Sequence, residues 1–370
     1  MSANAKKTFA LPFHTVKRDP MPWFAALLVR AAAVVLALIV SAVVITLLTH
    51  KDPIQVYASM IDGAFGIKNS ATTSLRVWSL LQDIAILLCV SLAVTPAFKM
   101  RFWNCGAEGQ VLIGGLATVS VMFFLGDKIP FPLLIVLMIA ASILAGIIWA
   151  VIPAVFKSLW NTNETLFTLM MNYIAIQFVA YFLKVFVKSG SGVLSPMKQF
   201  GLPVLAGKDY LLNIITVAVL TLVMYIYLKS TKQGYEISVV GESENTARYI
   251  GIDVKKVILR TLVVSGALCG VAGLLLVGGT NHTISTTTAG GRGFTAIMVS
   301  WLAKFNPIYM VFTTFLVVFL QKGAQQVSTD FRISNAISDI ITGIILLFII
   351  GCEFFLQYKI VRANSGKENN

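Results

Sequence analysis

Residues 132–153 read PLLIVLMIAASILAGIIWAVIP and contain no charged side chain. An α-helix rises 1.5 Å per residue, so about 20 such residues cross the roughly 30 Å hydrocarbon core of a bilayer. Comparable runs recur along the 370-residue chain, which is 57% hydrophobic and only 12% charged. Soluble domains usually carry about 25% charged residues. The sequence therefore predicts an all-α polytopic membrane protein.

Pro, Gly, Asn and charged residues divide the apolar sequence into separate candidate spans. We predict ten transmembrane helices, near residues 25–49, 79–98, 109–125, 132–153, 165–187, 211–228, 259–280, 293–303, 307–322 and 336–356. The run 293–303 is too short on its own, because about eleven residues at 1.5 Å each cover only half of the hydrocarbon core. It crosses only with help from the Gly-rich stretch before it, and eight or nine spans are the alternatives.

The formal net charge of +13 follows from this topology. With ten spans both termini lie on one face, and most of the 29 Lys and Arg residues fall on that face. Because Lys and Arg concentrate in cytoplasmic loops, both termini are predicted to be cytoplasmic. The tails are then 1–24 and 357–370, the transmembrane domain is 25–356, and its longest cytoplasmic loop is 229–258. The charge requires no nucleic-acid partner, and the spans leave no room for a soluble ATPase domain.

A few residues within the predicted spans are candidates for lining a transport pathway. They are Asp83, Asn172, Tyr173 and Gln177. A carboxylate at the centre of a membrane helix costs about 3 kcal/mol on insertion scales, so Asp83 needs water, a partner or protonation. For Asn172 and Gln177 the alternative to substrate contact is hydrogen bonding between helices. For Asp83 the alternative is a solvated position at the start of its helix.

Two short phrases of the same form stand at the starts of predicted spans. GAEGQ covers 106–110 and GGRGF covers 290–294, and both read Gly-x-charged-Gly-x. On the ten-span map the first phrase precedes the third span from the cytoplasm and the second precedes the eighth span from outside. This arrangement predicts an inverted repeat of spans two to five and seven to ten, a pattern that commonly frames transport pathways.

The sequence lacks the motifs of common enzymes. It contains no GxxxxGK[ST] phosphate loop, no HExxH and no GxSxG. The residues that nucleotide hydrolysis and the common hydrolytic mechanisms require are therefore missing. Its four cysteines are far apart and form no cluster with the three histidines, which argues against a metal site and favours buried thiols. We predict a chain that is not an enzyme by itself.

Several phrases together resemble a known transporter family. FWNCGAEGQVLIGG (102–115) is similar to the FNIGAEGQ signature of type II ABC importer permeases for nucleosides and simple sugars, the branched-chain amino acid and ribose type. NETLFTLMMNYIA (163–175) and GESENTARYIGID (241–253) look like two further phrases of that family, and GRGFTAI (291–297) and ITGIILLF (341–348) follow in order. Trp103, Cys105 and Thr246 depart from the family pattern, which blurs the substrate.

The resemblance implies a transmembrane permease subunit in a bacterial cytoplasmic (inner) membrane that moves nucleosides or simple sugars by alternating access. Its partners would be a cytoplasmic ABC ATPase that carries ATP and Mg, a second permease that is related or identical, an extracytoplasmic substrate-binding lipoprotein and membrane lipids; this chain would carry no cofactor. The alternative class is an ion-coupled secondary transporter in which Asp83 or Asp339 carries a proton or sodium ion.

The resemblance also assigns two groups of residues. A coupling helix for the ATPase would include Gly241, Glu242, Asn245, Thr246, Ala247, Arg248, Tyr249 and Gly251. The family phrase would shape the inner gate with Asn104, Gly106, Glu108, Gly109 and Gln110, of which the two glycines permit close backbone approach. The alternative for the coupling segment is a solvated loop, and for the phrase it is direct substrate contact.

Overall fold

The structure is a computed structural model that describes residues 13–18, 22–67, 70–187, 194–208 and 210–362. It divides into two compact units, the first formed by residues 1–63 with 320–370 and the second by residues 64–319. The division falls within two helices, α2 (Pro53–Phe65) and α12 (Pro307–Phe331). We describe each unit by itself.

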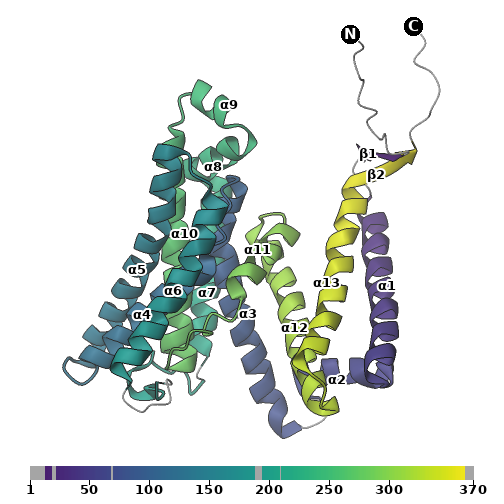
Figure 1. Cartoon of the computed structure of the whole chain (residues 1–370), viewed down its shortest axis with the longest axis horizontal. Coiled ribbons are helices and arrows are strands. Elements are labelled where there is room, and N and C mark those ends of the chain that lie inside the picture. Colours follow the sequence, from purple (N-terminus) through teal and green to yellow (C-terminus); the bar gives the residue numbers. More distant parts are fainter. Residues whose placement is uncertain (1–12, 19–21, 68–69, 188–193, 209, 363–370) are drawn as a thin grey trace, which may run out of the picture. The chain divides into compact units, whose positions relative to one another are not determined.

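The first unit joins the two ends of the chain. Helix α1 (Trp23–Thr49) packs along α13 (Asn335–Gln357), and the short strands β1 (Phe13–Lys17) and β2 (Tyr358–Arg362) form an antiparallel pair beside them (Figure 1). Helix α2 lies against the end of α12, because Gly323 leaves room for the backbone of Met60. The hydrophobic pattern does not predict this strand pair. One strand precedes α1 and the other follows α13.

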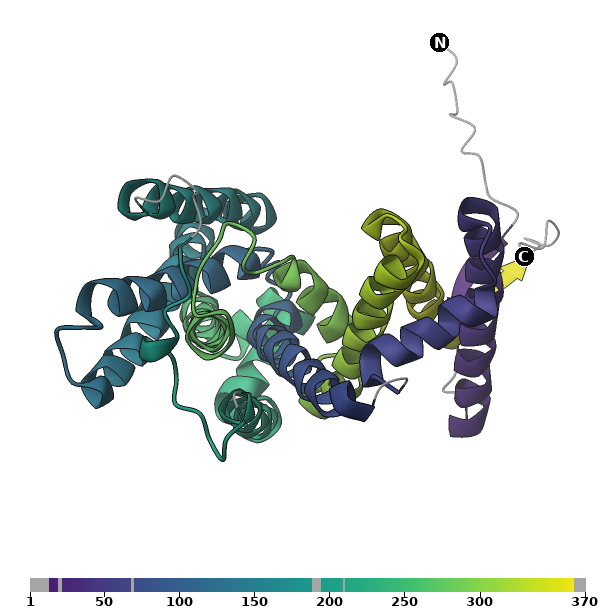
Figure 2. The same ribbon diagram turned by 90° about the horizontal axis from the view of Figure 1, so that it is seen from below.

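The second unit holds most of the predicted spans. Its elements are α3 (Ser70–Lys99), α4 (Ala107–Leu125), α5 (Phe131–Trp160), α6 (Glu164–Phe186), the 3-10 turn η1 (Lys198–Phe200), α7 (Leu211–Ser230), α8 (Lys232–Glu242), α9 (Glu244–Tyr249), α10 (Val254–Leu276), the π turn η2 (Val277–Asn281) and α11 (Arg292–Leu302). Helix α10 contacts α3, α4 and α5, and Figure 2 shows these helices from below.

Glycines let α10 approach its neighbours closely. A Cβ added at Gly114 of α4 would lie 2.7 Å from the Cα of Gly270, and one added at Gly146 of α5 would collide with the carbonyl oxygen of Gly266. Small residues at helix contacts are typical of membrane proteins, where close packing replaces the hydrophobic driving force. The core of this unit is therefore set by backbone contact along α10.

Eight helices in the described part of the chain are long and apolar enough to cross a membrane. They correspond to α3, α4, α5, α6, α7, α10 with its π turn, α12 and α13. The all-α polytopic fold is confirmed. The predicted spans at 25–49 and 293–303 are also helical, but α1 offers a shorter apolar stretch, Ala31–Leu47, and α11 has only 11 residues. The number of crossings and the inverted repeat stay predictions.

Candidate functional site

The two Gly-x-charged-Gly-x phrases meet in the interior of the second unit. The carboxylate of Glu108 accepts hydrogen bonds from the backbone N–H groups of Gly291 and Gly293, each at 2.7 Å. Only 8% of Glu108 is exposed. A Cβ at Gly293 would collide with the backbone of Glu108, so this glycine is required by the close approach. The first turn of α4 is thereby tied to the first turn of α11.

Electrostatics explains why this carboxylate lies at the start of α11. The first N–H groups of a helix lack partners within the helix, and the helix dipole favours negative charge there. Gly291 precedes α11 with φ +74°, a left-handed conformation that suits glycine and aims the following N–H groups at Glu108. Because Glu108 also lies in the first turn of α4, two helix starts stabilise one buried charge.

An ion pair lies beside this contact. Asp83 of α3 accepts a hydrogen bond from the guanidinium of Arg292 at 3.1 Å, and both side chains are about a quarter exposed. A carboxylate in a membrane helix needs a partner. For Asp83 this partner is Arg292, the charged residue of the GGRGF phrase. Asp83 was predicted as a pathway residue, whereas Arg292 was not singled out, because no local pattern connects residues 209 positions apart.

A second set of hydrogen bonds fixes the connection between α3 and α4. The Asn172 side chain of α6 accepts from the N–H of Gly109 and donates to the carbonyl of Cys105, both at 2.8 Å. Asn104 donates to Ser265 of α10 at 3.1 Å and accepts from Gln110 at 3.1 Å. The family phrase residues Asn104, Gly106, Glu108, Gly109 and Gln110 are all buried. The phrase is therefore a packed, hydrogen-bonded junction of α4, α6, α10 and α11, which we call the Glu108 junction.

The four predicted pathway residues differ in exposure and in contacts, and their role in a pathway stays a prediction. Asn172 is 4% exposed and holds backbone groups, whereas Tyr173 is 66% exposed and Gln177 is exposed. On an α-helix each residue turns about 100°, so Tyr173 and Gln177 share a face that points away from Asn172. The Asn172 contacts are those expected of the alternative reading, hydrogen bonding between helices. Asp339, the second candidate ion carrier, is exposed near the start of α13.

The predicted coupling segment forms two short helices, α8 and α9, with polar caps. Thr231 accepts from the N–H of Gly234, and Ser243 accepts from the N–H of Thr246. Asp253 accepts from the N–H of Lys256 at the start of α10, and this hydrogen bond lowers the pKa of the Asp253 carboxyl below its usual value. The segment is thus a folded element, not an irregular loop.

Exposure separates the residues of this segment into two groups. Glu242, Asn245, Thr246, Arg248, Tyr249 and Gly251 are exposed, and Tyr249 is 92% exposed. Gly241 and Ala247 are buried. Ala247 lies inside the turn that its carbonyl closes with the N–H of Ile252, so its side chain is not part of the exposed surface of this segment. The surface open to a partner is formed by the exposed group.

Two contacts attach this segment to the membrane helices. The carboxylate of Glu236 in α8 pairs with Arg260 of α10 at 2.6 Å. Gly241 lies against the carbonyl of Lys99, the last residue of α3, so closely that no Cβ would fit. A displacement of α8 therefore acts directly on α3 and α10.

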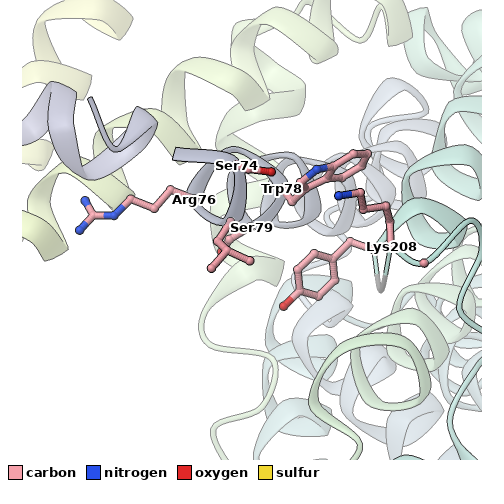
Figure 3. Close-up of a pocket in the computed structure, with 8 residues that line it drawn as sticks. Ser74, Arg76, Trp78, Ser79 and Lys208 are labelled. Carbon is pink, nitrogen blue, oxygen red and sulfur yellow. The ribbon is translucent and has the colours of Figure 1, made fainter. Parts of the chain in front are cut away.

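A cavity of about 460 Å³ lies near the start of α3, at the opposite end of this unit from α8 and α9 (Figure 1). Figure 3 shows Lys208 lying across the ring of Trp78, with the ammonium 5.7 Å from the ring centroid, whereas Arg76 points away. Tyr210 and Ser74 also line the cavity. A cation beside aromatic rings suits a polar solute with a planar group. The sequence reasoning named none of these residues, since the loop before α7 has no motif.

Comparison with known proteins decides the family. The family model for the branched-chain amino acid transport system / permease component matches residues 77–350. The chain belongs to this family. The matched region contains α4 to α11 whole, and with them the Glu108 junction and the α8–α9 segment. The resemblance predicted from the short phrases is therefore confirmed.

Three similar curated proteins are permeases of ABC transporters. A glucose ABC transporter permease of Haloferax volcanii is 27% identical over 326 residues, covering 84% of this chain and 84% of the relative. A guanosine ABC transporter permease of Bacillus subtilis is 28% identical over 331 residues, covering 87% and 92%. A nucleoside ABC transporter permease of Lactococcus lactis is 27% identical over 354 residues, covering 92% and 94%.

The chain is thus the transmembrane permease subunit of an ABC importer, a multi-pass membrane protein. It is a transport subunit and not an enzyme, because ATP hydrolysis belongs to the ATPase of such a system. Membership of this family means that the chain works with an ATPase and a substrate-binding protein. The ion-coupled alternative has no support from the relatives.

Proposed function

We propose that this permease imports nucleosides, with simple sugars as the next candidates. The substrate assignment rests on the relatives. Two of the three reported above are named for guanosine or nucleosides, at 28% and 27% identity over most of both chains. The third is named for glucose. A nucleoside combines a planar base with a hydroxylated sugar, and it needs hydrogen-bonding groups as well as an aromatic slot. The cavity at Trp78 and Lys208 offers both at the end of the second unit opposite α8 and α9.

The proposed docking site of the ATPase is the exposed surface of α8 and α9. Tyr249 is almost fully exposed and Arg248 is two-thirds exposed, although Arg248 also pairs with Glu244 at 3.3 Å. Tyr and Arg are enriched at protein interfaces, where an aromatic ring fills a pocket and a guanidinium pairs with carboxylates. The exposed ring of Tyr249 is therefore available for insertion into a pocket of a partner.

The attachment of α8 suggests how ATP binding moves the permease. A force on α9 would pass through α8 to the Glu236–Arg260 pair on α10 and to the Gly241 contact with α3. Helix α10 is packed tightly against α4 and α5, so these helices would move with it as a body. The Glu108 junction adds α11 to this body. Alternating access then results from rocking such bodies in two permease subunits.

The complete system would contain two permease subunits, an ATPase and a binding protein. We propose a cytoplasmic ATPase carrying ATP and Mg, a second permease that is a related chain or an identical one, an extracytoplasmic substrate-binding lipoprotein, and this chain in the cytoplasmic (inner) membrane with both termini in the cytoplasm. Co-purification of an untagged copy with a tagged copy would identify an identical partner. A cysteine-accessibility assay at either tail would test the orientation.

Coupling is tested in the complete transporter in proteoliposomes. Tyr249→Ala should lower ATP-driven uptake at least tenfold while the permease remains folded, because Tyr249 is 92% exposed and adds little to the packing of the described residues. Tyr181→Ala is the matched control, since Tyr181 is 65% exposed but lies in α6. Unchanged uptake and unchanged substrate-stimulated ATPase activity in the Tyr249 variant would contradict the docking site. Ala247→Arg is a poorer test, because it places a long side chain inside the turn.

The substrate is tested by competition. Uptake of labelled guanosine should be inhibited by an excess of other nucleosides and not by an equal excess of glucose or ribose. The binding protein that co-purifies with the tagged permease should release a nucleoside on denaturation. Inhibition by glucose alone, with bound sugar in the binding protein, would assign the chain to sugars instead.

A further inference from the structure

Four aromatic rings gather at the end of the second unit that carries α8. The indole rings of Trp103 and Trp301 stack with centroids 6.0 Å apart and an interplanar angle of 30°. Phe98 meets Trp103 edge-on at 5.7 Å, and Phe305 meets Trp301 edge-on at 5.2 Å. Trp103 is 47% exposed and Trp301 is 49% exposed. The phenyl rings therefore contact the indoles edge-on, while about half of each indole residue stays exposed.

The open side of the indoles faces a cavity of about 570 Å³. The polar part of its lining comes from the end of α3, the turn that follows it and α8, with Lys99, Arg101, Ser238 and Glu242. Trp residues of a membrane-interface belt face lipid headgroups, whereas these indoles share a concave, protein-lined space with charged and hydroxyl groups. The volume lies in the range of small-molecule sites, about 300–1,000 Å³.

We propose that this cavity binds the nucleobase of the transported solute on the release side of the membrane; the proposal rests on the nucleoside function proposed above. The base stacks on the Trp103 and Trp301 pair. Lys99 and Arg101 donate hydrogen bonds to base carbonyl or ring nitrogen acceptors, and the Glu242 carboxylate accepts from base amino or imino groups. Stacking tolerates different bases because each has a π face, so the site selects the class and not the individual nucleoside.

Two features connect this site with transport. Trp103 is one of the positions where the sequence departs from the family phrase, and it stands directly before the buried Asn104 of the Glu108 junction. Glu242 and Ser238 belong to α8, whose next residues form the proposed ATPase surface. A base held here therefore touches the residue next to the junction and also the coupling segment, so its release is sensitive to the movement of α8.

The site is tested with the complete transporter in nanodiscs, without the binding protein, by equilibrium dialysis of labelled guanosine. Trp103→Leu and Trp301→Leu should each weaken guanosine binding about tenfold, since Leu keeps apolar volume but removes the stacking face. Trp103→Phe should stay within about threefold of the wild type. Trp160→Leu is the matched control, because Trp160 is 64% exposed at the end of α5 but lies outside the cavity lining. Ribose, which has no base, should not compete.

A second measurement needs no variant that could fail to fold. Photolabelling of the wild-type transporter with 8-azidoguanosine should modify peptides containing residues 98–105 or 301–305. Equal affinity in the Leu variants and the Trp160 variant, or labelling confined to other peptides, would overturn the site. Guanosine uptake by the same transporter in proteoliposomes with its binding protein separates the two proposals: uptake without binding at these indoles rejects only this site, whereas absence of uptake rejects the nucleoside function.

Discussion

The starts of α11 and α10 are both held by a carboxylate, but in opposite surroundings. Glu108 reaches the start of α11 from 183 residues away in sequence and is 8% exposed. Asp253 caps α10 from the adjacent position and is exposed. The first contact joins two parts of the fold, whereas the second only begins a helix. The difference separates the buried junction, which determines the structure, from the α8–α9 end, which leaves side chains free for a partner.

The largest expected effect is that of removing the buried carboxylate. Glu108→Ala leaves the N–H groups of Gly291 and Gly293 without their acceptor in a largely buried site. Each such group costs about 1–3 kcal/mol, so we expect a loss of about 4 kcal/mol in the free energy of unfolding. Thermal unfolding of the purified permease in detergent measures this loss, and Asp253→Ala serves as the exposed counterpart. Equal melting temperatures for the two variants would show that burial does not distinguish the two carboxylates.

The close approach of the two phrases gives the next effect. Gly293→Ala should cost about 3 kcal/mol, near the upper end for overpacking, because the added Cβ collides with backbone rather than with a flexible side chain. Gly343→Ala in α13 is the matched control, since a Cβ there meets nothing within 4 Å. Comparison of the two melting temperatures separates the contact from the general effect of replacing a helical glycine. A Gly293 variant as stable as the Gly343 variant would contradict the tight contact.

A third prediction tests the two amides of α6. Asn172→Ala should lower the free energy of unfolding by about 2 kcal/mol, because it removes two hydrogen bonds to the backbone of the α3–α4 connection. Gln177→Ala, on the exposed face of the same helix, should change stability little. Thermal unfolding compares them directly. If the Gln177 variant were the less stable one, the assignment of faces on α6 would be wrong.

The sequence predicts the membrane helices well and their contacts poorly. Long uncharged runs such as 132–153 identify helices like α5, because the bilayer sets both composition and length. The Gly-rich phrase before residue 293 marks the short α11, since glycine permits the backbone that starts it. Helical spacing separates Asn172 from Tyr173 and Gln177, but it does not tell which face is buried. The partner of Glu108 could not be predicted, because contacts across 183 residues depend on how the whole unit packs.

The smallest expected effect concerns the exposed member of the comparison, Asp253, and depends on pH. Its hydrogen bond from the N–H of Lys256 lowers the pKa of the carboxyl, so the folded state favours the ionised form. The resulting stabilisation is present above the ordinary pKa of Asp, about 3.9, and is lost as the pH falls through the lower pKa of the folded state.

Asp253→Asn keeps an oxygen acceptor for the Lys256 N–H but does not titrate. The difference in melting temperature between wild type and this variant should therefore be constant near neutral pH and should shift against the wild type below pH 4, while every other carboxyl group titrates alike in both. A difference that did not change with pH would mean that the charge of Asp253 contributes nothing to the start of α10, although its oxygen still accepts the hydrogen bond from Lys256.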